Sequence, residues 1–386
     1  MAELLFWLFL CLFLYTYLGY PVLLWLFSFR LKKQSKHRSE LPSVAVVIAA
    51  YNEQEVIAAK LLNTLQLHYP ASKMKVVVVA DGSTDRTTAI VKEFNEVQLL
   101  FQPERNGKSA AINRAMEFVD AEVVVVTDAN TFLSSGTLTE LLAPFADERV
   151  GGVSGAKKVQ AAGTVSAAGS GEGIYWRYES MLKELEASFY SVIGAAGELF
   201  AFRRDLFRPI PVEAITDDFY VSLSINLQGK TIAYTTRAAA TEAASLSLQD
   251  EWNRKVRIAA GGFQSLVYFA TALNPFLYPR LSFQFFSHRV LRWIITTPAL
   301  LFIFFCNAWL VLQRTGVGYD FLFVLQCFFY GLALAGFLFR HSGTNRLLQL
   351  PFYFVLMHAA LPVGAWRYLT GRQSAVWQKA RRPVTE

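Results

Sequence analysis

The sequence of 386 residues has little charge and very little cysteine. Only 17% of its residues are charged, against about 25% in soluble domains, while 53% are hydrophobic and 15% aromatic. The aromatic content excludes a disordered chain. The three cysteines, Cys11, Cys306 and Cys327, all lie in apolar runs, which excludes a disulfide scaffold and a thiolate metal site. A purely soluble protein is therefore doubtful before any motif is considered.

Negative charge is also in deficit, with 37 Lys and Arg against 30 Asp and Glu, a net charge of +7. Such a surplus suits nucleic acid, anionic lipid headgroups or an anionic substrate. Much of it borders apolar runs, at Arg30–Arg38, Arg289–Arg292 and Arg372–Arg382. No nucleic-acid motif accompanies it, so we expect lipid bilayer contact and no nucleic-acid partner.

The apolar residues are concentrated at the two ends of the chain. From Leu4 to Phe29 no residue is charged, which exceeds the roughly 20 residues needed to cross a bilayer. The run is too long for a signal peptide and lacks a basic start, so we predict a transmembrane anchor at 1–29. By the positive-inside rule, the basic juxtamembrane spacer at 30–42 places the next domain in the cytoplasm.

Three further apolar runs, Trp293–Leu312, Phe321–Phe339 and Leu347–Trp366, predict a transmembrane helix cluster at 289–370. A basic tail follows at 371–386. Three full crossings would put this tail outside, against the positive-inside rule. Either the third run is re-entrant, or an earlier segment also crosses, or the rule fails here.

The central region, 43–262, has a different pattern from the ends. Short β-branched runs at Val44–Ala50, Lys75–Ala80 and Glu122–Thr127 alternate with stretches of helical spacing. This alternation predicts an α/β domain with a largely parallel, doubly wound sheet. After it, segment 263–288 is aromatic but interrupted by proline and arginine, and we predict interfacial amphipathic helices there.

Polar residues follow each of the three predicted strands, where a doubly wound sheet binds its ligands. They are Tyr51-Asn52-Glu53, Asp81-Gly82-Ser83-Thr84-Asp85 and Thr127-Asp128-Ala129-Asn130. Taken singly, each is an ordinary strand-to-helix loop with a helix-capping side chain. Three such loops at one sheet edge indicate a binding site, although neither GxGxxG nor a P-loop signature is present.

These motifs occur in a characteristic order: AAYNE, ADGSTDRT, NGKSAAINRA, VVVVTDANT, then GAAGELFAFRRDLF at Gly194–Phe207 and TDDF at Thr216–Phe219. Together they resemble the membrane-bound family-2 inverting glycosyltransferases of the GT-A fold, a Rossmann-like, mostly parallel sheet. The layout with flanking transmembrane helices is similar to the hyaluronan, cellulose and poly-N-acetylglucosamine synthase group. The resemblance implies a hexosyltransferase of polysaccharide biosynthesis in a membrane, with a bacterial inner membrane expected. It would move a sugar from a nucleotide-sugar, with UDP expected, to a polysaccharide or lipid-linked acceptor at the cytoplasmic face.

The resemblance places the catalytic base at Asp218, next to Asp217. An inverting transfer needs a carboxylate to take the proton of the acceptor hydroxyl, and partial burial beside Asp217 would raise the pKa of Asp218. The alternative is that both residues only cap the following helix, Phe219–Leu227.

Asp128-Ala129-Asn130 lies where the family carries its DxD motif, which implies a Mg²⁺ or Mn²⁺ cofactor. Asn130 departs from the commoner second Asp, and its carbonyl oxygen is a weaker ligand. The alternative for Asp128 is a helix cap. The resemblance assigns the nucleotide-sugar to a further set: Tyr51, Glu53, Asp81, Asp85, Lys108 and Asp128. Glu53 could instead be a first-turn helix carboxylate, and Lys108 a solvated lysine at a helix start.

The segment Gln249–Gly262 departs from the Q-x-x-R-W motif of processive members, because Trp252 and Asn253 occupy its fourth and fifth positions. The basic residues after it, Arg254, Lys255 and Arg257, could hold diphosphate oxygens or form a basic face beside anionic lipid. The resemblance suggests an acceptor site at Gly197, Glu198 and Trp252.

The departure favours, as an alternative, single-sugar transfer to a polyprenyl-phosphate or diacylglycerol lipid. A non-catalytic nucleotide-binding component of a transport system is a third possibility, and the acids Asp81, Asp128 and Asp218 argue against it. The sugar, linkage and oligomeric state are not readable from the sequence.

Overall fold

The computed structural model describes residues 1–28, 40–160, 167–243, 247–340 and 346–376, and the chain divides into two compact units. The sheet unit comprises Leu31–Ala162, Tyr178–Ala244 and the segment from Ser374. The helical unit comprises Met1–Arg30, Gly163–Arg177 and Ser245–Gln373. The predicted spacer 30–42 and tail 371–386 lie largely outside the described residues.

The sheet unit is built on an eight-stranded mixed sheet in the order β3-β2-β1-β4-β7-β6-β8-β5. Its strands are β1 Val44–Ala50, β2 Met74–Asp81, β3 Val97–Gln102, β4 Val123–Asp128, β5 Thr131–Leu133, β6 Val150–Gln160, β7 Leu199–Arg203 and β8 Thr231–Ala243. Strands β3, β2, β1 and β4 are parallel, whereas β7 is antiparallel to both β4 and β6. The expected mostly parallel, doubly wound arrangement is confirmed, with antiparallel strands on one side of it.

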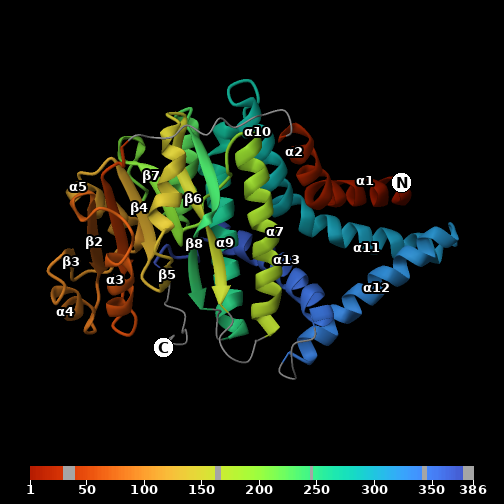
Figure 1. Ribbon diagram of the computed structural model, residues 1–386. Coiled ribbons are helices and arrows are strands. Elements are labelled where there is room, and N and C mark those ends of the chain that lie inside the picture. Colours follow the sequence, from red (N-terminus) through yellow and green to blue (C-terminus); the bar gives the residue numbers. More distant parts are fainter. Residues whose placement is uncertain (29–39, 161–166, 244–246, 341–345, 377–386) are drawn as a thin grey trace. The chain divides into compact units, whose positions relative to one another are not determined.

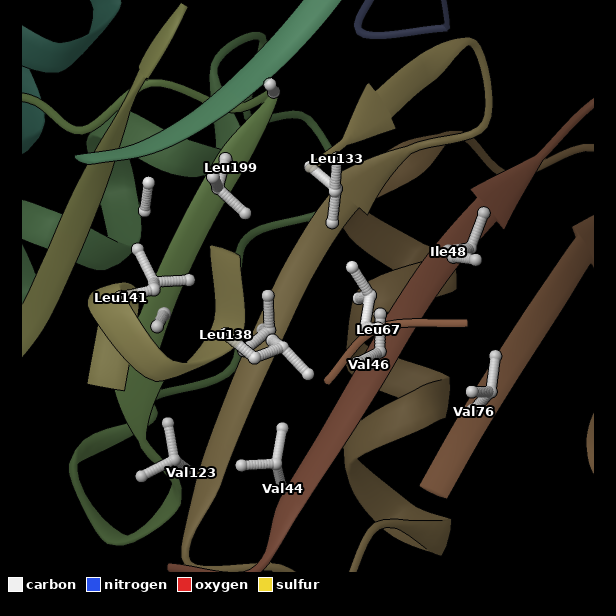
Figure 2. Close-up of a cluster of buried hydrophobic side chains, with 14 of the residues drawn as sticks. Val44, Val46, Ile48, Leu67, Val76, Val123, Leu133, Leu138, Leu141 and Leu199 are labelled. Atoms are coloured by element: carbon white, nitrogen blue, oxygen red, sulfur yellow. The ribbon is translucent and has the colours of Figure 1, made fainter. Parts of the chain in front are cut away.

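Helices cover both faces of this sheet, which is why its valine-rich strands are buried on both sides. Val44, Val46 and Ile48 of β1 pack into one cluster (Figure 2), and Ala45 and Val47 pack into a second on the other face. The first cluster includes residues of α3 (Ile57–Leu65), α4 (Thr87–Lys92) and α6 (Thr137–Leu142). The second includes residues of α5 (Lys108–Phe118) and α8 (Asp217–Leu227).

The register of the parallel strands brings the three polar loops to one edge. Ala49 of β1 is paired with Asp128 of β4, and Ala50 is paired with Ala80 of β2. Asp81 and Asp128 therefore end the two strands that flank β1. This is the carboxyl edge where an open α/β sheet binds ligands.

The helical unit contains the predicted apolar runs (Figure 1). Its main elements are the N-terminal part of α7 (Ala167–Phe189), α1 Ala2–Leu14, η1 Tyr15–Gly19, α2 Tyr20–Ser28, α9 Leu248–Tyr268, α10 Pro279–Phe285, η6 Phe286–Ile295, α11 Thr296–Leu312, α12 Val317–Leu338 and α13 Arg346–Leu369. Among the described residues, four stretches are long and apolar enough to cross a membrane, and we call them the first to fourth apolar rods: Ala2–Ser28, Pro279–Leu312, Val317–Leu338 and Leu347–Leu369. They match the four runs expected from the sequence.

Two predicted boundaries differ from the structure. Helix α9 runs without interruption through the expected domain end at residue 262 and stops at Tyr268. Within 263–288, the second apolar rod, Pro279–Leu312, begins at Pro279. Proline at the first position of a helix is compatible with the helix and does not break it. The apolar stretch thus begins ten residues before the predicted cluster at 289–370.

Candidate active site

The first two loops at the carboxyl edge are tied together by side chains that the sequence suggested as helix caps. Asn52, at a left-handed φ of 53°, accepts a hydrogen bond from the Thr84 amide at 2.8 Å. Asp85 accepts from the Gln54 amide at 3.1 Å and from the Thr87 amide at 2.9 Å. Asp85 therefore binds the first amide of α4 and also fixes the loop after β1, so its carboxylate has a structural role.

Asp81 positions the loop that leads into α5. Its carboxylate is buried and accepts hydrogen bonds from the backbone amides of Asn106, at 3.1 Å, and Gly107, at 2.7 Å. Gly107 has a φ of 92°, a conformation that glycine adopts without the strain of a side chain. By holding this loop, Asp81 sets where Lys108, the first residue of α5, enters the site.

Tyr51 and Glu53 occupy the loop after β1. The Arg105 guanidinium carbon lies 3.5 Å from the centre of the Tyr51 ring, a cation–π contact. The Glu53 amide donates to Thr87 Oγ1 at 2.8 Å. Their assignment to the nucleotide stays a prediction, as does that of Asp81 and Asp85.

Lys108 connects two of the predicted acids. Its Nζ lies 2.7 Å from Asp128 Oδ1 and 3.6 Å from Asp217 Oδ2. Burial alone would lower the pKa of Lys108, but Asp128 and Asp217 outweigh it and keep the pKa above its ordinary value. Lys108 is therefore a fixed positive charge between β4 and α8, and it is not a solvated helix-start lysine.

Asp218 is in a different environment from its neighbour Asp217. Burial and the nearby Asp217 carboxylate raise the pKa of Asp218 to about 6, although the Lys108 ammonium opposes the shift. The Phe219 amide donates to Asp218 Oδ1 at 2.8 Å. A Cβ on Gly197 would lie 3.1 Å from Oδ2, so glycine allows the backbone to approach this carboxylate closely.

A small cavity opens beside these acids. Its lining includes Gly197, Phe200, Asp217, Asp218 and Val221. One wall is thus apolar and the other carries two carboxyl groups.

A buried ion network that the sequence did not reveal supports Glu198. The Lys157 side chain is 1% exposed and pairs with Glu198 and, at 2.5 Å, with Glu242. Asn130 Nδ2 donates to Glu242 Oε1 at 3.5 Å. The network links Glu198 to the turn that carries Asp128 and Asn130, through residues of β6 and β8 that are remote in sequence.

Lys60 is a second residue that was missed. It lies on α3 with no exposed surface, and its Nζ donates to Thr127 Oγ1 at 3.1 Å and to the Thr131 carbonyl at 2.7 Å. Thr131 Oγ1 in turn donates to the Asp128 carbonyl at 2.9 Å. Lys60 thus holds the turn between β4 and β5 from beneath. Its position in the apolar stripe of α3, with Ile57, Leu61 and Thr64, is a signal that the sequence contained.

The predicted metal ligands offer a sparse but suitable donor set. Asp128, one-third exposed, supplies a carboxylate, and the amide oxygen of Asn130 is a hard oxygen ligand of the kind Mg²⁺ and Mn²⁺ take. Among the described residues, no group of three His, Cys, Asp or Glu could hold a metal ion. The residues therefore fit a cation that shares its coordination with substrate oxygens and water, as Mg²⁺ commonly does.

The remaining predicted residues lie on α9 in the helical unit, Trp252 among them. Arg254 Nη2 is 2.7 Å from Glu251 Oε2, and Lys255 Nζ is 3.5 Å from Glu251 Oε1. Burial alone would raise the pKa of Glu251, but the positive charges of Lys255 and Arg254 outweigh burial and lower the pKa to about 2. Two of the three basic residues expected to hold diphosphate, Arg257 being the third, are thus engaged in ion pairs within their own helix.

The chain is similar to known glycosyltransferases in sequence and in fold. The sequence pattern of the family described as "Glycosyl transferase family 2" matches residues 45–210. A β-monoglucosyldiacylglycerol synthase of Nostoc sp. is 27% identical over 284 residues, 69% of this chain and 59% of that protein. A poly-β-1,6-N-acetyl-D-glucosamine synthase of Staphylococcus aureus is 26% identical over 247 residues, 61% of this chain and 58% of that protein. The chain thus aligns with about three-fifths of the length of these relatives.

A solved mannosyltransferase of Pyrobaculum calidifontis has the same fold. It superimposes with a TM-score of 0.71 at 24% identity, over 96% of this chain and 100% of that one. The matched residues contain nearly all of β1, all of β2 to β7, and the loops that carry Asp81, Lys108 and Asp128. Residues 45–210 thus form a domain that matches the family-2 glycosyltransferases and has the GT-A fold, and the described residues include four candidate membrane-spanning helices beside it.

Proposed function

We propose that this chain transfers a sugar from a nucleotide-sugar, with UDP as the expected nucleotide, to a polysaccharide or lipid-linked acceptor at the cytoplasmic face of a membrane. The observation that carries the proposal is the pairing of unlike acids around Lys108. Asp217 and Asp128 contact its ammonium, whereas Asp218 is buried beside them with a pKa raised to about 6. A base with a pKa near the working pH and a fixed cation are the two groups an inverting transfer needs.

In the proposed step, Asp218 takes the proton of the acceptor hydroxyl while that oxygen attacks the anomeric carbon. The new carbon–oxygen bond forms as the bond to the diphosphate breaks, and the diphosphate leaves with the electron pair. Attack from the face opposite the leaving group inverts the configuration. Lys108 supplies a positive charge on the edge where the diphosphate would lie.

Asp128 and Asn130 would hold the divalent cation, Mg²⁺ or Mn²⁺. When bound, that cation supplies positive charge to the diphosphate. Support comes from the hard oxygen donors at this turn and from the Pyrobaculum mannosyltransferase, which was solved with GDP-mannose and Mn²⁺.

We assign the acceptor to the segment Gly197-Glu198, next to the Asp218 carboxylate, and the assignment of Trp252 rests on the sequence resemblance alone. Two classes of acceptor are to be compared. One relative is named as a poly-β-1,6-N-acetyl-D-glucosamine synthase and another as a β-monoglucosyldiacylglycerol synthase. For Arg254 and Lys255 to bind diphosphate, their ion pairs with Glu251 would have to break.

The experiment is to incubate the purified protein with UDP-glucose, UDP-N-acetylglucosamine and GDP-mannose, with and without Mn²⁺, and to follow nucleoside diphosphate release and product mass together. We expect metal-dependent release with at least one donor, lost in Asp128→Ala and retained in Asp120→Ala, an exposed acid of the same unit. Nucleotide binding without turnover of any donor would instead support a non-catalytic component. Release that is equal in Asp128→Ala would reject the assigned metal site.

Product mass separates the two acceptor classes. A ladder of long products indicates a polysaccharide synthase. A single added sugar on diacylglycerol or polyprenyl phosphate indicates the lipid-directed alternative, which the altered Q-x-x-R-W segment favours.

A further inference from the structure

The segment that follows α13 returns to the sheet unit. Residues from Ser374 belong to that unit, and a Cβ on Gly107 would lie 3.3 Å from Cγ2 of Val376. Gly107 is in the loop that Asp81 holds at the carboxyl edge of the sheet. Residues 374–376 are therefore on the same side of the membrane as the sheet.

This contact restricts how often the chain can cross the bilayer. Three candidate spans separate the sheet unit from Ser374: Pro279–Leu312, Val317–Leu338 and Leu347–Leu369. An odd number of crossings would leave Ser374 on the opposite side from the sheet. Since both lie on one side, one of the three does not cross.

The packing of α13 identifies it as that segment. It lies along α9, whose first three turns carry Asp250, Glu251, Arg254, Lys255 and Arg257. So many charges exclude α9 from the hydrocarbon core. At one end of the contact, the Tyr353 hydroxyl donates to Glu251 Oε1 at 2.9 Å, and Lys255 Nζ lies 5.6 Å from the centre of the Tyr353 ring.

The contact continues along both helices. A Cβ on Gly364 would lie 2.5 Å from the Ala259 Cβ and 2.8 Å from the Val256 carbonyl oxygen, so the two backbones approach closely. Between Tyr353 and Gly364, α13 runs for about 16 Å at 1.5 Å per residue. At the Tyr353 end, α13 contacts the charged side chains of Glu251 and Lys255, and at the Gly364 end it contacts Val256 and Ala259, which flank Arg257. Both ends of this length are therefore beside the charged turns of α9, as in a helix parallel to a membrane surface and not in a crossing helix.

The other side of α13 reaches the first and second apolar rods. Tyr17 Oη is 2.8 Å from His358 Nε2, and Thr297 Oγ1 donates to the His358 carbonyl at 3.2 Å. A helix with polar neighbours on α9 and apolar rods on its other side fits the boundary between headgroups and acyl chains.

We propose that α13 lies in the membrane interface on the side of the sheet unit, against phospholipid headgroups and the upper acyl chains, and that the chain crosses the bilayer three times. The crossings are Ala2–Ser28, Pro279–Leu312 and Val317–Leu338. This topology resolves the conflict that three crossings after the sheet unit create, because Arg372 then lies on the same side as the sheet unit, as the positive-inside rule expects. It does not depend on the proposed function.

Hydrogen bonds between the beginnings of the first and third apolar rods agree with this topology. Trp7 Nε1 donates to the Tyr319 hydroxyl at 3.1 Å, and that hydroxyl donates to Glu3 at 3.3 Å. The beginnings of α1 and α12 are thus together, as they are when both lie on the side opposite the sheet.

The test uses single cysteines in a full chain in which Cys11, Cys306 and Cys327 are replaced by alanine. The variants are Glu93→Cys in the sheet unit, Gln313→Cys before α12, Arg340→Cys after α12 and Ser374→Cys after α13. Each is labelled in sealed vesicles of known orientation with a thiol reagent that does not cross membranes, and then again after detergent. Gel filtration in detergent selects the variants that fold, and Arg372→Cys replaces Ser374→Cys if that one fails.

We expect Gln313→Cys to be labelled from one side and the other three from the opposite side. Labelling of Ser374→Cys together with Gln313→Cys would show that α13 crosses and would overturn the proposal. Labelling of Arg340→Cys from the side of Gln313→Cys would overturn it too, because α12 would then not cross.

Discussion

The chemistry depends on two adjacent carboxyl groups that the fold treats differently. Asp217 contacts Lys108, whereas Asp218 faces Gly197 and the apolar wall of the cavity. Burial disfavours the charged form of Asp218, and a second carboxylate next to it disfavours that form further. One acid can therefore pair with a cation while the other exchanges a proton near neutral pH.

The raised pKa of Asp218 predicts an acidic limit to activity. A base must be deprotonated to act, so the rate should fall about tenfold per pH unit below about 6. Asp217→Asn should move this limit to lower pH, because it removes a like charge that raises the pKa of Asp218. The pH profile of kcat/KM measures both effects. An unchanged midpoint in Asp217→Asn would argue against this electrostatic account.

Gly197→Ala should slow transfer with little loss of stability. The added methyl group would lie 3.1 Å from Asp218 Oδ2 and would displace the carboxylate by a few tenths of an ångström or more. Such misplacement of a reacting group costs about 10²-fold in kcat when it approaches 1 Å, so we expect a fall of about tenfold. Gly136→Ala is the matched control, since a Cβ there meets nothing within 4 Å. Equal kcat in the two variants would contradict the assigned contact.

Among the elements, α3 contributes more than packing. Its apolar stripe contains Lys60, whose side-chain amino group donates to Thr127 and to the Thr131 carbonyl under the turn that carries Asp128. A buried donor set of this kind fixes a loop only while its partners are present. The turn is thus held from the core side of the sheet.

Lys60→Met should destabilise the protein by about 1–3 kcal/mol, because it leaves buried oxygens of Thr127 and Thr131 without their donor. The midpoint of urea unfolding in detergent measures this change. Lys75→Met, at an exposed position of β2, should leave the midpoint unchanged. Equal midpoints in the two variants would show that the hydrogen bonds of Lys60 add no stability.

At this scale, the sequence predicted the elements that local pattern determines. The strand at Val44–Ala50 was confirmed with its bounds, since a continuous apolar run is a local signal. The pairing of Lys157 with Glu242 could not be predicted, because it depends on the parallel register of β6 and β8. The ion pairs of α9 were not predicted, because Arg254 and Lys255, three and four residues after Glu251, were interpreted as groups that bind a ligand.

Over the whole molecule, the low fraction of charged residues is an average over one part that suits water and another that suits a lipid bilayer. The sheet unit has the strand and helix pattern of an α/β domain, and the helical unit carries the four long apolar stretches. The sequence predicted the four apolar runs but not which of them cross, because hydropathy records composition and not the side on which a chain ends. The contact of Val376 with the Gly107 loop supplies that information.

The most direct test of the account is the turnover of Asp218→Asn in the full-length protein with its preferred nucleotide-sugar. Asparagine keeps the shape of the side chain and cannot accept the proton. We predict that kcat falls by about 10²–10⁴-fold while the Kd for the nucleoside diphosphate changes by less than about threefold. Wild-type turnover in Asp218→Asn would contradict the assignment of this carboxylate as the base.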